Sequence, residues 1–160
     1  AEWCKLKIKA DGPPLYLSNT YAPHEGRPIE EKEEFYKQLD NRCWKITKKK
    51  ELLCIGDFNV RWHARRENEH DTLGPCTVGR GNDFMEKKES KLIQATNREL
   101  CMDWCHGNDM VHSNSWFGKD IEKKITYRDI EFNNFYWLIS KCYLLNSNLF
   151  LPLWHWRRFF

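Results

Sequence analysis

A strand, a helix and a second strand follow one another between residues 15 and 55, and this succession restricts the fold more than any other feature of the sequence. Residues 15–21 alternate, with Leu15, Leu17 and Tyr21 expected on one face. Residues 29–43 place apolar side chains along one helical stripe behind an acid-rich first turn. The run LLCI at residues 52–55 is typical of a short buried strand. We therefore predict an α/β fold in which a crossover unit packs on a sheet.

Further elements are expected on both sides of this unit. Residues 5–9 alternate and are separated from the next strand by the turn signal DGPP, so the two strands predict a β-hairpin. Residues 60–88 are polar and Gly-rich, which predicts a long irregular segment. Residues 97–106 predict a second helix that GND ends, and strands are expected at residues 110–117 and 124–127.

Composition limits the class of protein. With 160 residues the chain is long enough for one domain with a core. Its net charge of +3 allows a polyanionic partner without requiring one. The seven cysteines are odd in number and contain no CxxC pair, which indicates reduced thiols and an intracellular location, nuclear or cytoplasmic. The basic runs KITKKK and RWHARR are either solvated surface or contacts to nucleic acid.

Two predicted strands end in polar side chains. The motif GDFN offers Asp57 and Asn59 after the buried strand, and the segment NTYAPHEG offers Tyr21 and His24 after the preceding one. A carboxylate can accept a proton from water, and an amide or a phenol can hold an anion. Together these groups suit a phosphodiester site, in which catalysis depends on positioning and charge neutralisation. The alternative is that GD is only a turn and Asn59 only a cap.

The ordered motifs resemble the endonuclease/exonuclease/phosphatase superfamily. The likeness is greatest to the endonuclease domains of LINE-type (non-LTR) retrotransposons and to craniofacial development protein 2-like proteins. It runs over residues 15–128: a Tyr-x-Pro after a strand, GDFN, the Gly-rich loop LGPCTVGRGND, CHGNDMV, HSNSWF and ITY. It implies a DNase I-like two-layer β-sandwich flanked by helices, truncated here at both ends, and hydrolysis of DNA phosphodiesters with Mg²⁺.

The resemblance also implies roles for individual residues. Asp57 corresponds to the acid that orients or deprotonates the attacking water, Asn59 to the amide that supports it and the phosphate, and Tyr21 to a phenol on the phosphate side. His24 occupies a position where the AP-endonuclease branch often has Asn, and it can still donate to phosphate. The arginines that follow GDFN could contact the nucleic-acid backbone: Arg61, Arg65 and Arg66.

The sequence also departs from the family pattern. The family's Asn and metal-binding Glu before the hairpin, and its Ser-Asp-His segment near the end, have no counterpart in this chain. Glu25 and Asp129 lack the context of substitute ligands, and His155 has no preceding Ser-Asp. We therefore expect a fragment, inactive or nearly so, in which residues 1–131 are a partial nuclease domain. Residues 132–160 would be a divergent aromatic-rich tail, read either as core strands or as out-of-frame sequence, and not as a membrane span.

Several alternatives remain open at this point. A repair-type AP endonuclease, a phosphatase fragment or a catalytically dead nucleic-acid-binding module would share these motifs. A reverse transcriptase domain is the partner expected in a parent polyprotein, with DNA as the substrate and no small-molecule cofactor. The spacing of Cys101, Cys105 and His106, with His112 nearby, is compatible with zinc, although both cysteines also suit the apolar face of a helix. His63, His70 and Cys76 have irregular spacing and are weaker zinc candidates.

Overall fold

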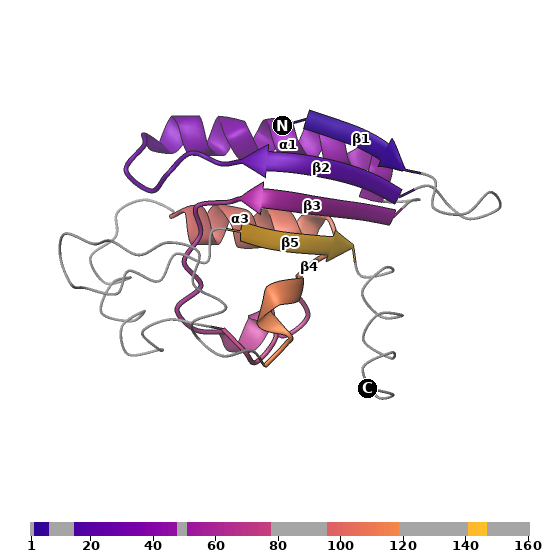
Figure 1. Ribbon diagram of the computed structural model, residues 1–160. Helices are drawn as coiled ribbons and strands as arrows, with labels where there is room; N and C mark the ends of the chain where they lie inside the picture. Colours follow the sequence, from indigo (N-terminus) through magenta and orange to yellow (C-terminus); the bar gives the residue numbers. More distant parts are fainter. Residues whose placement is uncertain (1, 7–14, 48–50, 78–95, 119–140, 147–160) are drawn as a thin grey trace, which may run out of the picture.

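One mixed β-sheet with helices on one face makes up the described part of the chain, which comprises residues 2–6, 15–47, 51–77, 96–118 and 141–146 of a computed structural model (Figure 1). The described strands are β1 (Glu2–Leu6), β2 (Leu15–Tyr21), β3 (Glu51–Asp57), β4 (Met110–His112) and β5 (Lys141–Asn146). The described α-helices are α1 (Ile29–Thr47) and α3 (Asn97–Gly107). The strand order is β1-β2-β3-β5-β4, in which β2 and β3 are parallel and the other neighbours antiparallel. The predicted α/β class is confirmed.

The strand–helix–strand unit forms as the sequence predicts. Strands β2 and β3 pair in parallel from Leu15 opposite Glu51 to Tyr21 opposite Asp57, and α1 connects them. Helix α1 runs to Thr47, four residues beyond the predicted end, and β3 extends the predicted strand by one residue at its start and two at its end. The predicted hairpin is confirmed by the antiparallel pairing of β1 with β2. Its first strand lies at Glu2–Leu6, so the predicted residues 7–9 fall outside the described part.

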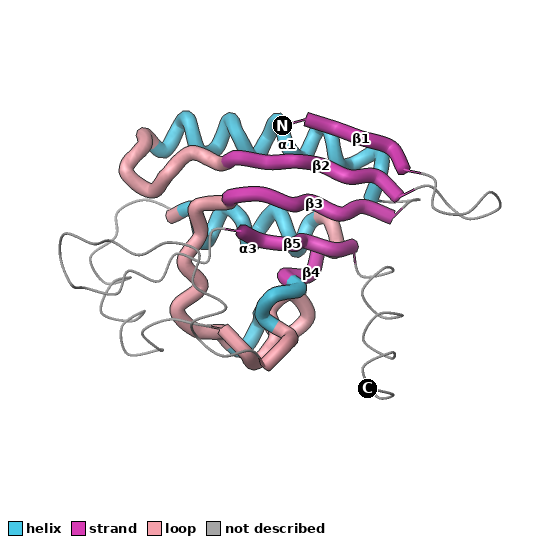
Figure 2. The backbone as a smooth tube through the Cα atoms, in the orientation of Figure 1, coloured by secondary structure: helices cyan, strands magenta, loops and turns pink. Residues whose placement is uncertain are grey.

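The core lies between the sheet and the two helices (Figure 2). Alternate residues of β3, Leu52 and Cys54, are fully buried there, as the period of a strand requires. Helix α3 contributes Cys101, Trp104 and Cys105 to the same cluster, which confirms their predicted packing role. Of the cysteine side chains that the structure describes, none forms a disulfide bond: Cys43, Cys54, Cys76, Cys101 and Cys105.

The predicted strand over residues 110–117 is wrong in its second half. Strand β4 ends at His112, and a 3₁₀-helix, η2 (Ser113–Ser115), follows. The Ser115 hydroxyl donates to the His112 carbonyl over 2.6 Å, and the Trp116 N–H donates to the Ser113 carbonyl over 3.1 Å. These local bonds compete with extension of the strand because short polar side chains satisfy the backbone themselves. The predicted strand over residues 124–127 lies outside the described residues.

The predicted irregular segment after β3 is irregular as far as residue 77, apart from a short 3₁₀-helix, η1 (Glu67–Glu69), and is firmly packed. Val60, Trp62 and Leu73 are buried in the core. Leu73 also forms a parallel bridge with His112 at the end of β4. The rest of the predicted segment, residues 78–88, lies outside the described part.

Strand β5 comes from the aromatic-rich segment that was assigned to residues 132–160. It pairs with β3 on one side and with β4 on the other, so this part of the segment is a strand within the sheet. That agrees with the core-strand interpretation of residues 141–146, whereas the domain boundary at residue 131 stays a prediction. No helix in the described ranges is long and apolar enough to cross a membrane.

Candidate active site

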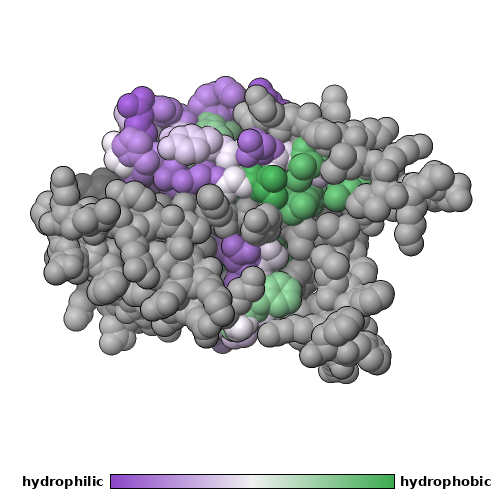
Figure 3. Space-filling view, viewed as in Figure 1, coloured by the Kyte–Doolittle hydropathy of each residue, from purple (hydrophilic) through white to green (hydrophobic). Residues whose placement is uncertain are grey.

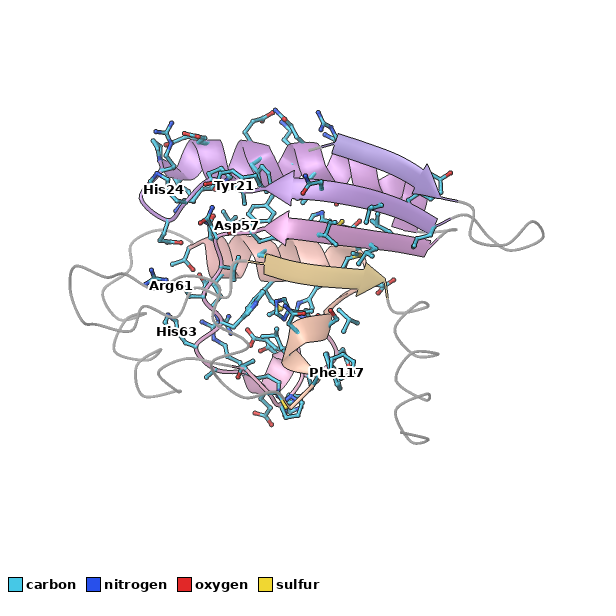
Figure 4. All side chains as sticks on the ribbon, in the orientation of Figure 1. Tyr21, His24, Asp57, Arg61, His63 and Phe117 are labelled. Carbon is cyan, nitrogen blue, oxygen red and sulfur yellow. The ribbon has the colours of Figure 1, made fainter. Side chains whose placement is uncertain are left out.

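The carboxyl ends of β2 and β3 bring two predicted site residues together. Tyr21 and Asp57 are the last residues of these parallel strands and are paired in register. The Ala22 N–H donates to the Asp57 carbonyl over 2.8 Å and so extends the contact beyond the strands. The Tyr21 side chain is 75% exposed, and Asp57 is half-buried. Figure 4 places both at the same edge of the sheet, which is where open α/β sheets carry functional groups.

The glycine of GDFN allows this close approach of the two strands. Gly56 has a φ of +138°, which side chains of L-residues rarely adopt. A Cβ at this position would lie 1.9 Å from the Thr20 carbonyl oxygen in β2. Gly56 therefore lets β3 lie close against β2 immediately before Asp57.

The rest of GDFN forms a turn that fixes Asp57 and Asn59 relative to each other. Asp57 Oδ1 accepts the Asn59 N–H over 2.8 Å, and Asn59 has a left-handed backbone with a φ of 49°. Between them the Phe58 ring is fully buried, with its centroid 6.3 Å from that of Trp104. The carboxylate is thus held by its own turn on one oxygen, and Oδ2 of Asp57 accepts no hydrogen bond within the described part of the chain.

The Asn59 side chain connects the two strand ends. Its Nδ2 donates to the Ala22 carbonyl over 2.7 Å, directly after Tyr21. The amide is therefore used to hold the segment after β2 beside the turn after β3. In this structure the Asn59 side chain binds a backbone carbonyl, and its support of a phosphate stays a prediction.

The predicted phosphate-contact residues separate into two groups. His24 and Arg61 are exposed, and Figure 4 shows them at the edge that carries Tyr21 and Asp57. The His24 ring accepts the Gly26 N–H on Nδ1 over 3.1 Å. Arg65 donates to the Leu73 carbonyl over 3.3 Å, and Arg66 forms ion pairs with Glu69 and Glu99. In Figure 3 hydrophilic residues gather around this edge, whereas hydrophobic residues lie toward the other end of β2 and β3.

Asn97, which the sequence interpretation did not select, lies behind this edge. It is the first residue of α3, and its side chain is fully buried. Its Nδ2 lies 2.7 Å from the Pro23 carbonyl oxygen and 3.4 Å from that of Asn59, and its N–H donates to Glu25 Oε2 over 3.0 Å. The sequence signal at this point is the capping-box pattern Thr96-x-x-Glu99, in which the Glu99 carboxylate accepts the Thr96 N–H over 3.1 Å.

The next residue of α3, Arg98, fixes the segment that follows GDFN. Its guanidinium binds the Glu69 carboxylate through two contacts of 2.7 Å, and both side chains are buried. It also donates to the carbonyls of Trp62 and Ala64 over 3.3 and 3.0 Å. Burial by itself raises the pKa of Glu69, but the hydrogen bonds from Arg98 and from the Arg66 N–H outweigh it and lower the pKa. Glu69 is therefore an ionised structural anchor.

Asp57 is the one member of GDFN with a carboxylate, the side-chain group through which proteins usually bind Mg²⁺. Within the described ranges no group of three or more His, Cys, Asp or Glu side chains could hold a metal ion. The Glu25 carboxylate accepts the Asn97 N–H and lies 3.7 Å from Lys32 Nζ, so it serves the protein backbone and a lysine. Of the other acids considered as ligands, Asp129 lies outside the described part, as does His155.

The zinc alternative receives no support from the positions of its candidate ligands. Cys101 and Cys105 are buried in the core, whereas His106 is exposed at the end of α3. His112 is buried beside Trp62, with ring centroids 5.2 Å apart, and this burial lowers its pKa to about 3. His63 and His70 lie in the segment after GDFN, outside that core.

The edge as a whole can bind an anion and position a carboxylate beside it. An exposed phenol, an imidazole and a guanidinium surround the end of β3, and each can donate to a phosphate oxygen. No family model matches the chain, and a search of curated proteins gives no match either.

Proposed function

We propose that the chain is a fragment of a Mg²⁺-dependent DNA endonuclease with a DNase I-like fold, of the kind with which retrotransposons nick DNA. In the parent protein it would accompany a reverse transcriptase domain. The described residues would form the part of the site that positions water and phosphate, while the chain alone hydrolyses DNA weakly or not at all. The observation that carries the proposal is the register pairing of Tyr21 with Asp57 beside the GDFN turn.

Each residue at the edge has a role consistent with phosphodiester hydrolysis. The turn holds Asp57 by one carboxylate oxygen, which leaves the other to orient a water or accept its proton as the water attacks phosphorus. The bond from phosphorus to the ester oxygen breaks in the same displacement, and the leaving oxygen takes a proton from solvent. Tyr21 is exposed beside it and can donate its hydroxyl hydrogen to a phosphate oxygen. His24 would donate a hydrogen bond to a phosphate oxygen, and Arg61 would neutralise phosphate charge. Mg²⁺, which the resemblance implies, would need further carboxylates, so we assign no step to it.

DNA binding tests the first half of the proposal. Fluorescence anisotropy with a labelled duplex, repeated over a series of salt concentrations, measures affinity and its salt dependence. We expect salt-sensitive binding, and we expect Arg61→Ala to reduce the slope of log affinity against log salt by about 1, as for one lost phosphate contact. Arg42→Ala is the matched control because Arg42 is an exposed arginine on α1, away from the edge. Absence of DNA binding, or equal slopes for the two variants, would contradict the proposal.

Plasmid nicking tests the second half. Supercoiled DNA is incubated with Mg²⁺ and the chain, and conversion to the open-circular form is measured on a gel. We expect no more nicking by the unmodified chain than by Asp57→Ala. Robust nicking that Asp57→Ala abolishes would support the endonuclease assignment and overturn the proposed inactivity. Robust nicking that survives Asp57→Ala would instead remove Asp57 from the chemistry.

A further inference from the structure

A single buried amide joins the two segments that carry the proposed site. Asn97 Nδ2 contacts the Pro23 carbonyl in the segment after β2 and the Asn59 carbonyl in the turn after β3, over 2.7 and 3.4 Å. These contacts join residues 74 and 38 positions apart in the chain. We infer that Asn97 is a positioning residue that sets the separation of Tyr21 and His24 from Asp57. This inference rests on the function proposed above.

The segment after β2 is held on both sides of His24. Pro23 accepts a hydrogen bond from the Asn97 side chain, and Glu25 accepts one from the Asn97 backbone N–H over 3.0 Å. Lys32 of α1 supports the same place, with Nζ 3.4 Å from the Glu25 carbonyl and 3.7 Å from its carboxylate. His24 thus lies between two residues, Pro23 and Glu25, that both accept hydrogen bonds from Asn97 at the start of α3.

The turn after β3 is held at a point where its backbone is left-handed. Asn59 donates its side-chain amide to Ala22 and presents its carbonyl to Asn97. Two asparagines therefore connect the segment after β2 to the turn after β3: Asn59, which follows β3, and Asn97, at the start of α3. Without Asn97, the bond from Asn59 Nδ2 to the Ala22 carbonyl is the side-chain hydrogen bond that still joins the segment after β2 to the turn after β3 among the described residues.

The other half of the Asn97 side chain, its carbonyl oxygen, is an unpaired acceptor among the described residues. Its Oδ1 is fully buried and accepts no hydrogen bond within the described part of the chain. A buried acceptor without a donor costs free energy. An apolar residue at this position would avoid that cost, but it could not donate to the Pro23 and Asn59 carbonyls as Asn97 Nδ2 does.

Helix α3 supplies a matched control at its other end. Asn108 is 3% exposed and donates its Nδ2 to Asp40 Oδ1 over 2.7 Å and to the Trp104 carbonyl over 3.0 Å. Like Asn97 it is a buried asparagine with two side-chain contacts to other groups. It differs by lying at the opposite end of the helix from the carboxyl ends of β2 and β3 (Figure 1). Asn97→Ala and Asn108→Ala should therefore cost similar stability and differ in their effect on the edge.

Two measurements on the same variants test the inference. Amide hydrogen exchange followed by NMR reports the Ala22 and Asn59 N–H groups, which bond to the Asp57 carbonyl and carboxylate. After correction for the change in global stability, we expect Asn97→Ala to speed exchange at both N–H groups by about tenfold. After the same correction, Asn108→Ala should leave the exchange rates of both groups unchanged. Duplex affinity should fall about fivefold in Asn97→Ala, as for one lost hydrogen bond, and stay unchanged in Asn108→Ala.

The outcomes separate failure of this inference from failure of the proposed function. Should Asn97→Ala fold with exchange at Ala22 and Asn59 no faster than in Asn108→Ala, the positioning role is wrong whatever the chain binds. Faster exchange in a chain that never binds DNA supports the positioning role and overturns the endonuclease proposal. If Asn97→Ala does not fold, Asn97→Ser takes its place, since serine keeps a small polar group and cannot reach both carbonyls.

Discussion

The burial of His112 predicts that the protein loses stability in mild acid. The ring is 1% exposed and lies against Trp62, and burial lowers its pKa to about 3 from an ordinary value of 6.5. Between these two values the unfolded chain binds a proton that the folded chain does not. His112 therefore contributes full stability above about pH 6.5 and progressively less as the pH falls toward 3.

The size of the effect follows from the same two values. Each pH unit below 6.5 removes about 1.4 kcal/mol of unfolding free energy, so the loss is about 2 kcal/mol at pH 5. The limiting loss near pH 3 is about 5 kcal/mol, a large part of the stability of an ordinary domain. Glu69 acts in the same direction only at lower pH, because its pKa lies below the ordinary value of 4.5. Measurements above about pH 5 therefore isolate the histidine.

Urea denaturation at about pH 7.5 and about pH 5 measures this difference. His112→Gln should reduce the drop in unfolding free energy by about 2 kcal/mol, whatever its own stability at neutral pH. His70→Gln removes an exposed histidine instead and should leave the drop unchanged. A His112→Gln variant that keeps the pH dependence of the unmodified chain would refute this role of His112, as would an equal loss of the pH dependence in both variants.

Three further substitutions test the packing around the site. Gly56→Ala should destabilise the protein by about 3 kcal/mol or more, because of its φ and the Thr20 oxygen 1.9 Å from the new Cβ; an unchanged melting temperature would contradict this. Arg98→Met should lower the free energy of unfolding, measured by urea denaturation, by about 3–5 kcal/mol, because it leaves Glu69 buried without its partner. Adding Glu69→Leu should restore most of the lost stability, and a double variant as unstable as the single one would argue against a buried ion pair. Asn59→Gly should be about 1 kcal/mol more stable than Asn59→Ala, since both lose the bond to Ala22 but only alanine is strained at a φ of 49°; equal stabilities would mean that the backbone relaxes.

The elements that the sequence predicted correctly are those with a local pattern. The alternation in β2, the helical stripe of α1 and the apolar run of β3 each lie within one element, and together they predicted a crossover unit. The structure adds the direct parallel pairing that brings Tyr21 to Asp57. Strand β4 was overestimated because the serines after His112 bond locally, which hydrophobic pattern does not register.

The supporting residues of the site were missed for a different reason. The contacts of Asn97 and Arg98 join positions 29 to 74 residues apart, and nothing in TNRE identifies the partners. The capping pattern in Thr96-x-x-Glu99 could have marked the start of a helix, but not the carbonyls against which it packs. Buried polar contacts of this kind depend on the assembled fold, so the hydrophobic periodicity of the sequence does not predict them.

The position of β5 in the sheet has a consequence for synthesis of the chain. Strands β3 and β4 both pair with β5, which lies between them in space but follows them in sequence. After His112 has been added, 34 more residues must be joined before Asn146 is present, as the two numbers show by subtraction. At translation rates of roughly 5–20 residues per second this takes about 2–7 s. During that interval β3 has one edge without its strand partner, and such edges are templates for pairing with other chains. The nascent protein would therefore be most exposed to aggregation just before its last described strand emerges, and a chaperone that covers β3 in that interval would protect the same edge that β5 later occupies.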